Sequence, residues 1–330
     1  MNARQLQFIK PEEVKIIDVT LKEPGSNEVL VQALYCGISP GTERLAYRGE
    51  FPSDILLDDS IKELNYQAQY PFTYGYILIG EVKKTGSKKN EWMEGKRVLV
   101  FHPHQDRVVV DIDRLIFLPP ELSSEQSVLL PNCETAVTFI QDAAPLMGER
   151  VCLYGLGVVG QISARMLSAF PLKELVLVDP SLYRRNYAKK ISGVSINSTI
   201  SEKLIQNDFD LTLELSGSPS ALQSSIDGAS YDGRLLVGSW YGNKTVSLDL
   251  GSKFHRKRLK LFSSQVSTIS PALRGRWDYK RRMETALNWL IENQDSFWIT
   301  HKIPFEHASK AYEIINEPGG NYLQVVLDMK

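Results

Sequence analysis

A short glycine-rich segment in the middle of the chain constrains the fold more than any other feature. Gly155, Gly157 and Gly160 form the pattern G-x-G-x-x-G, directly after the apolar run 151–154 and at the start of a helical pattern over 158–170. Glycines at these places permit a tight turn and let a helix pack closely on the preceding strand. Short apolar runs keep alternating with helical patterns as far as LKLFSSQ, which predicts an α/β fold with a doubly wound parallel sheet.

The glycine turn also predicts a binding site for a dinucleotide coenzyme. The first turn of the following helix offers unpaired N–H groups and a partial positive charge to a pyrophosphate. In a Rossmann sheet, the phosphates bind at the turn after the first strand. The predicted contacts are Gly155, Leu156, Gly157, Val158, Val159 and Gly160.

The next apolar run ends at Asp179, which bears on the choice of coenzyme. We expect its carboxylate to accept hydrogen bonds from the adenosine ribose and to repel a 2′-phosphate. This favours NAD(H) over NADP(H). Arg184 and Arg185 follow closely and weaken the argument, and Asp179 can also be read as a solvated residue at a strand end.

The sequence before and after this region predicts a second, β-rich domain. EVLVQALYCGIS, YILIGEVKKTG and KRVLVFHPH alternate apolar and polar residues as strands do. We therefore assign 1–122 to the first part of the β-rich domain and 123–268 to the Rossmann domain. We expect 269–330 to return to the first domain.

Composition excludes several classes of partner and compartment. Lys+Arg 38 and Asp+Glu 39 leave a net charge of -1, so no nucleic-acid partner is expected. No apolar run is long enough for a membrane span, and the N-terminus does not resemble a signal peptide. The 3 cysteines are widely spaced and form no CxxC pair, so we expect free thiols and a cytoplasmic location.

Several segments together resemble the medium-chain dehydrogenase/reductase family. GISPGTERLAYRG, YPFTYGYILIGEV, the glycine turn and ITHKIPFEHASKAYEIINEP are similar to the bacteriochlorophyllide dehydrogenase branch. ETAVTFIQDA, SWYG, FHRKRLKLFSSQV and GRWDYKRR are similar to a branch of zinc-type alcohol dehydrogenases. The resemblance implies a GroES-like catalytic domain beside the Rossmann domain, and a small organic substrate. It also implies a homodimer that pairs Rossmann sheet edges, with LKLFSSQ as the edge strand.

The residues that would bind zinc in this family are absent from the matching positions. Ser39 stands where the family has a cysteine, Tyr76 follows Gly75 where it has a histidine, and Pro131 occupies the third position. A hydroxyl, a phenol and an imino acid do not replace thiolate, imidazole or carboxylate ligands. His102 and His104 share one face of a strand as substitute ligands, but no third one is evident. We predict no zinc.

We therefore predict a zinc-independent oxidoreductase that passes hydride between NAD(H) and an alcohol or ketone. Hydride transfer needs a group that moves a proton on or off the substrate oxygen. Tyr76 is the first candidate, by its position in the resemblance. Each candidate also has a purely structural interpretation, as a strand, turn or helix-start residue. The further catalytic candidates are Ser39, Thr42, Glu43, His104 and Glu134.

Other candidates lie where predicted strands end. Ser216, Gly217 and Trp240 follow strands of the Rossmann sheet, at the edge where ligands of such sheets bind. We expect Ser216, Gly217 and Trp240 to contact the coenzyme. The basic segment 254–258, which contains His255, is either a solvated loop or a site for an anionic group on the substrate.

Two other functions are compatible with the same motifs. Zinc-free members of the family also reduce activated C=C bonds, usually with NADPH. Loss of every zinc ligand also fits a catalytically inactive dinucleotide-binding sensor or partner subunit.

Overall fold

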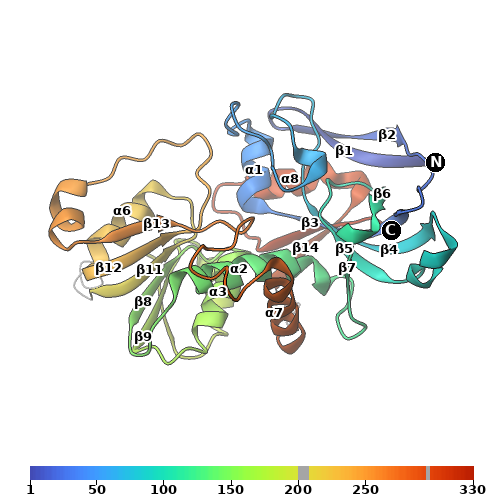
Figure 1. Cartoon of the computed structure of the whole chain (residues 1–330). Coiled ribbons are helices and arrows are strands. Elements are labelled where there is room, and N and C mark those ends of the chain that lie inside the picture. Colours follow the sequence, from blue (N-terminus) through green and yellow to red (C-terminus); the bar gives the residue numbers. More distant parts are fainter. Residues whose placement is uncertain (200–207, 295–297) are drawn as a thin grey trace. The chain divides into compact units, whose positions relative to one another are not determined.

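The computed structural model describes residues 1–199, 208–294 and 298–330 (Figure 1). The chain divides into two compact units. Unit 1 comprises 1–130, 293–320 and 324–330, and unit 2 comprises 131–292 and 321–323. These divisions differ from the predicted boundaries at 122/123 and 268/269.

Unit 2 contains a parallel sheet of six strands in the order β10-β9-β8-β11-β12-β13. Numbered along the chain from β8, this is the order 3-2-1-4-5-6 of a Rossmann sheet, which confirms that prediction. Every neighbouring pair is parallel. The strands are β8 (Arg150–Tyr154), β9 (Glu174–Val178), β10 (Val194–Asn197), β11 (Phe209–Glu214), β12 (Ala229–Val237) and β13 (Lys260–Ser263).

The strands of unit 2 bury side chains on both faces of the sheet. In β8, Val151 and Leu153 pack with residues of α2, α3 and α4 in one apolar cluster. Cys152 and Tyr154 point to the other face, where Ala221 of α6 packs against them. This explains why β8 is apolar without alternation. The helices are α2 (Leu130–Ala143), α3 (Val158–Leu167), α4 (Leu182–Ala188) and α6 (Pro219–Gly228).

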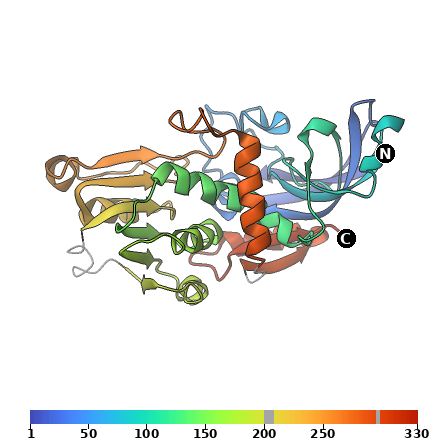
Figure 2. The same cartoon turned by 60° about the horizontal axis from the view of Figure 1, so that its bottom comes forward.

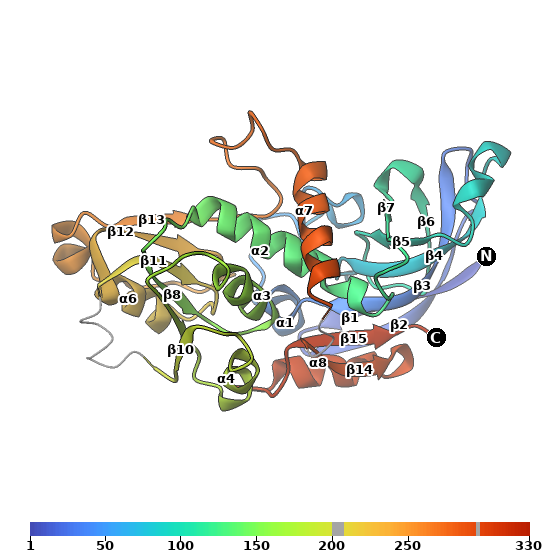
Figure 3. The same ribbon diagram turned by 90° about the horizontal axis from the view of Figure 1, so that it is seen from below.

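A further helix, α7 (Tyr279–Glu292), belongs to unit 2 although its residues were assigned to the C-terminal return. Figures 2 and 3 show it beside α2. Arg282 of α7 donates hydrogen bonds to Glu134 of α2 at 2.8 and 3.1 Å. This contact ties α7 to the unit that precedes it in the sequence.

Unit 1 is built around a sheet with the order β14-β15-β3-β4-β5-β7, in which β6 also pairs with β3. Its pairs are antiparallel except β14 with β15. A separate hairpin joins β1 (Asn2–Lys10) to β2 (Glu13–Thr20). The sheet strands are β3 (Glu28–Ile38), β4 (Ile77–Thr85), β5 (Arg97–Val100), β6 (Arg107–Asp111), β7 (Ile116–Phe117), β14 (Ile299–Pro304) and β15 (Gln324–Asp328).

Two helices of unit 1 position the residues discussed below. α1 (Pro40–Arg48) follows β3 directly, with Ser39 as its N-cap and Pro40 as its first residue. α8 (Ala308–Asn316) lies along β14 and β15 (Figure 3). The two helices meet where Tyr47 stacks on Tyr312, with ring centroids 5.4 Å apart. None of the helices in the described ranges is long and apolar enough to cross a membrane.

Candidate functional site

The glycine turn of unit 2 is closed by backbone contacts that exclude side chains at two of its positions. Gly155 has φ of +93°, and a Cβ there would lie 2.7 Å from the backbone of Leu215 and Ser216. A Cβ on Gly160 would overlap the carbonyl oxygen of Gly155. Both glycines are therefore required by the fold of the turn itself.

Gly157 differs from Gly155 and Gly160 because no described residue fills the space where its Cβ would lie. It is the N-cap of α3, with φ of -64°, a conformation open to any residue. A Cβ built on Gly157 would meet no heavy atom within 4 Å. The turn thus leaves open space next to the N–H groups that begin α3, as a pyrophosphate requires.

Asp179 lies at the end of β9 and connects this strand to the glycine turn. Its carboxylate is buried and accepts the backbone N–H of Leu156 at 2.7 Å and that of Ser181 at 2.8 Å. A carboxylate has about four acceptor positions, so these bonds leave capacity for another donor. The predicted contact with a ribose stays a prediction.

The two arginines after Asp179 are held by groups of unit 2. Arg185 donates to the carbonyl oxygens of Asp179 and Pro180 at 2.7 and 2.8 Å. The guanidinium of Arg184 lies over the ring of Tyr322, and its Nη1 is 3.9 Å from the Asp179 carboxylate. The opposite charges of Arg184 and Asp179 therefore partly cancel, which reduces the electrostatic effect of either side chain on a coenzyme.

Glu214, which the sequence analysis missed, organises the neighbouring strand ends. This buried residue ends β11, and one carboxylate oxygen accepts the backbone N–H groups of Ser216 and Gly217 at 2.7 and 3.1 Å. The other oxygen accepts the hydroxyl of Tyr241 at 2.9 Å. Burial, and the Glu214 charge after it, raise the pKa of Tyr241. The sequence signal that could have identified Glu214 is an acidic residue at the end of an apolar run.

These contacts bring the predicted coenzyme residues of unit 2 to one edge of the sheet. The close approach of Gly155 to Ser216 joins the ends of β8 and β11. Gly217 donates its N–H to Ser239 at 2.8 Å, just before Trp240, and so joins β11 to the end of β12. All of them follow the carboxyl ends of parallel strands, where ligands of such sheets bind.

The basic segment 254–258 lies at the opposite edge. It precedes β13, whose first residue, Lys260, pairs in parallel register with Arg234 of β12, whereas Ser263 pairs with Val237. The segment is therefore next to the amino ends of the strands. It does not belong to the edge that carries the glycine turn, and the anionic group on the substrate stays a prediction.

In unit 1, Ser39, Thr42 and Tyr76 form a cluster of hydroxyl groups, here called the hydroxyl cluster. Tyr76 immediately precedes β4 and is half-buried. Burial raises the pKa of Tyr76, and hydrogen bonding to Ser39 and Thr42 partly opposes this rise. The hydroxyls of Ser39 and Thr42 lie 3.4 Å apart. With a raised pKa, the phenol of Tyr76 keeps its proton at neutral pH.

Glu43 and His104 lie next to the hydroxyl cluster but are completely buried. The Glu43 carboxylate is 2.9 Å from Nε2 of His104 and accepts the hydroxyl of Tyr312 at 2.6 Å. Burial alone would lower the pKa of His104, but the charge of Glu43, with the side chains of Cys36 and Glu43 as hydrogen-bond partners, raises it to about 10. We refer to Glu43, His104 and Tyr312 as the buried trio.

The residues considered as zinc ligands do not converge. His104 faces Glu43, whereas Nδ1 of His102 lies 2.8 Å from the carbonyl oxygen of Pro103. Burial lowers the pKa of His102. Within the ranges that the structure describes, no three His, Cys, Asp or Glu residues are grouped in a way that could hold a metal ion.

Glu134 belongs to a buried ion pair of unit 2. Its carboxylate receives two hydrogen bonds from Arg282, which also donates to the carbonyl oxygen of Thr268 at 3.1 Å. Burial raises the pKa of Glu134 although the Arg282 charge opposes the rise. Its described contacts are those of a link between α2 and α7, and its catalytic role stays a prediction.

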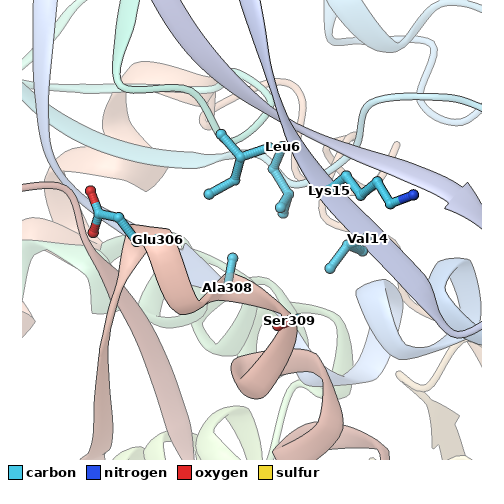
Figure 4. Close-up of a pocket in the computed structure, with 7 residues that line it drawn as sticks. Leu6, Val14, Lys15, Glu306, Ala308 and Ser309 are labelled. Carbon is cyan, nitrogen blue, oxygen red and sulfur yellow. The ribbon is translucent and has the colours of Figure 1, made fainter.

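Figure 4 shows a pocket of unit 1 between the β1–β2 hairpin and the start of α8. The amino group of Lys15 and the carboxylate of Glu306 lie on opposite sides of it and do not converge. Glu306 is paired with Arg4 at 2.8 Å, and Lys15 with Glu13 at 2.8 Å. No predicted site residue lines this pocket, which is formed by Leu6, Val14, Lys15, Ile16, Glu306, Ala308 and Ser309.

The chain is similar in sequence to characterised bacterial enzymes, although no protein-family model matches it. It is 23% identical over 311 residues to D-guloside 3-dehydrogenase of Escherichia coli, covering 87% of this chain and 88% of that protein. It is 23% identical over 271 residues to (R,R)-butanediol dehydrogenase of Bacillus subtilis, covering 72% and 77%. These relatives are dehydrogenases. They support the prediction of an oxidoreductase.

Solved structures of dehydrogenases share the fold of the whole chain. The 2R,3R-butanediol dehydrogenase of Bacillus subtilis superposes with a TM-score of 0.79 at 17% identity, over 99% of both chains. An Escherichia coli protein described as a short-chain alcohol dehydrogenase, in complex with NADH, gives 0.77 at 18% identity over 99% of both. A Sinorhizobium meliloti protein assigned as a zinc-binding dehydrogenase, bound to NADP, gives 0.75 at 17% identity, again over 99% of both. The predicted fold class, with a GroES-like sheet and a Rossmann sheet, is confirmed.

Proposed function

We propose that this protein is a zinc-independent, NAD(H)-dependent oxidoreductase of the medium-chain dehydrogenase/reductase family that interconverts an alcohol and a ketone. The observation that carries the proposal is that a Cβ on Gly157, the N-cap of α3, would meet no heavy atom of the described residues within 4 Å. Relatives named D-guloside 3-dehydrogenase and (R,R)-butanediol dehydrogenase support the reaction class.

Unit 2 supplies the residues for the coenzyme. The N–H groups at the start of α3 fit a pyrophosphate, and Asp179 retains acceptor capacity for a ribose hydroxyl. Glu214 holds the Ser216–Gly217 corner in place at the same edge. Bound nicotinamide supplies or accepts the hydride.

Unit 1 supplies the proton chemistry. Tyr76 carries a protonated phenol that donates to the oxygen of a ketone, and Ser39 and Thr42 orient it. Proton donation leaves the Tyr76 phenolate, which regains a proton from water. In the reverse direction the phenolate, and not the hydroxyl, accepts the proton of the alcohol. Glu43 and His104 are buried away from solvent and do not serve as the proton donor.

The direct test is turnover by the purified protein. We expect NADH oxidation with a ketone panel and NAD reduction with the matching alcohols. Loss of an enone absorbance without ketone turnover would instead indicate C=C reduction. Binding of NADH without turnover of any of these substrates would indicate an inactive sensor or subunit.

Zinc independence is proposed from the donor atoms present. Ser39 and Tyr76 offer only hydroxyl groups, and the imidazoles of His104 and His102 already face Glu43 and a carbonyl oxygen. We expect purified protein to contain well below one equivalent of zinc by mass spectrometry, and turnover to survive treatment with a chelator. A full equivalent of zinc, or inactivation by the chelator, would contradict this.

Coenzyme preference is tested at Asp179. Asp179→Ala removes a charged acceptor, so we expect binding of NADH to weaken by about tenfold and the advantage over NADPH to narrow. Asp179→Asn keeps an oxygen for the Leu156 N–H but removes the charge and the acceptor of the Ser181 N–H, so it should change the preference with a smaller loss of stability than alanine. Titration of both coenzymes measures this, and an unchanged preference in both variants rejects the role.

We also propose how the protein assembles and where it is located. β13 is the edge strand of the unit 2 sheet, and β12 is its neighbour in the described ranges. Leu261 on β13 is 37% exposed, so we propose that this edge pairs with a second copy. The free, buried thiols of Cys36, Cys133 and Cys152 support a cytoplasmic location.

A further inference from the structure

The buried trio removes charged groups from water, which is unfavourable for the stability of the fold. Glu43, His104 and Tyr312 are each 0% exposed. A buried ion pair is often no more stabilising than apolar side chains of similar volume, because both charges lose their hydration. The trio does not touch solvent and so does not meet a substrate directly. Its contacts suggest a different use.

Glu43 fixes the part of the hydroxyl cluster that contains Ser39 and Thr42. One of its oxygens accepts the backbone N–H of Ser39 at 2.8 Å, while the other accepts the Tyr312 hydroxyl and faces His104. Ser39 and Thr42 therefore lie at a turn that is fixed by the Glu43 carboxylate. This carboxylate is itself held by Tyr312 of α8 and by His104. Charge-assisted bonds of this kind are shorter and stronger than neutral ones.

His104 fixes the segment that carries Tyr76, the third residue of the hydroxyl cluster. Its backbone N–H donates to the carbonyl oxygen of Tyr74 at 3.3 Å. Its imidazole packs directly on Gly75, where φ is +90° and any Cβ would overlap the ring. Gly75 immediately precedes Tyr76. The same imidazole that pairs with Glu43 thus determines where the chain can place the phenol.

We infer that the buried trio positions Ser39, Thr42 and Tyr76 for proton transfer, by clamping the turn before α1 and the segment before β4 onto one ion pair. This inference rests on the proposed function, because it assigns proton transfer to the hydroxyl cluster. Glu43, His104 and Tyr312 are positioning residues in this scheme, and misplacement of reacting groups is costly even when the groups remain present.

The test compares Glu43→Ala with Glu43→Gln in the full chain. Alanine removes the acceptor of the Ser39 N–H, so we expect kcat to fall about tenfold or more while KM for NADH is unchanged. Glutamine keeps an oxygen for Ser39 and can donate to a neutral His104, so it should recover most of the loss. Glu28→Ala is the matched control, because Glu28 also accepts a backbone N–H, from Gly25 at 2.9 Å, at the other end of β3.

Hydrogen–deuterium exchange provides a second readout that does not need activity. We expect Glu43→Ala to speed exchange in peptides covering 36–48 and 72–79, and Glu28→Ala to leave both unchanged. If Glu43→Ala does not fold, Tyr312→Phe removes one hydroxyl only and should lower kcat by about two- to fivefold with faster exchange in 36–48.

The outcomes separate the inference from the proposed function. Wild-type kcat and exchange in folded Glu43→Ala, or in Tyr312→Phe, would overturn the inference. An equal effect of Glu28→Ala would also overturn it. If the wild-type protein turns over no substrate but Glu43→Ala alters exchange in both segments, the proposed function fails while the clamping of the two segments stands.

Discussion

Replacing Tyr76 with phenylalanine should lower kcat by about 10²-fold or more while coenzyme affinity stays within about twofold. The reason is that the change removes one oxygen and its proton, and leaves a ring of the same shape before β4. Burial raises the pKa of Tyr76, so the phenol is protonated over the neutral range and is suited to donate. Ser39 and Thr42 remain, but their aliphatic hydroxyls are much weaker acids than the phenol that has been removed.

Tyr66→Phe is the matched control for this variant. The Tyr66 hydroxyl is bonded to the backbone carbonyl of Thr73 at 3.0 Å and to its side chain at 2.9 Å, and lies outside the hydroxyl cluster. Steady-state kinetics on both variants should show a loss in Tyr76→Phe alone. Near-normal turnover of Tyr76→Phe would remove the phenol from the mechanism.

The Rossmann unit could be predicted from the sequence because its signals are local. β8, β9 and β11 are each a short apolar run followed by a helix, and the glycines act within a single turn. The approach of Gly160 to Gly155 involves residues of the same motif. The strand order then follows from the general rules of parallel sheets. Asp179 was placed correctly at a strand end for the same reason, although its bonds to Leu156 and Ser181 were not foreseen.

The contacts of the buried trio could not be predicted because they join distant parts of the chain. Tyr312 and Glu43 are separated by 269 positions, and His104 and Glu43 by 61. Glu43 was selected from its position in the family resemblance and His104 from its residue type, but no local pattern says that they meet. Tyr312 was missed because it lies within an ordinary amphipathic helix. The sequence also predicted that His102 and His104 share one face of a strand, but β5 ends at Val100, so neither residue lies in a strand.

Gly157→Ala should weaken NADH binding by about tenfold or more with little change in stability. The structure separates this glycine from Gly155 and Gly160, since only Gly157 has no atom within 4 Å of a Cβ and an ordinary backbone conformation. The added methyl group therefore costs the free protein at most about 1 kcal/mol at the N-cap of α3. It would instead occupy the space into which we place the pyrophosphate.

The most direct measurement is a fluorescence titration of NADH into the wild-type protein and Gly157→Ala, with thermal unfolding of both. We predict saturable binding by the wild type, about tenfold or more weaker binding by the variant, and unfolding midpoints within a few degrees of each other. Equal affinity in the two proteins, or no NADH binding by the wild type, would contradict a coenzyme held at the start of α3.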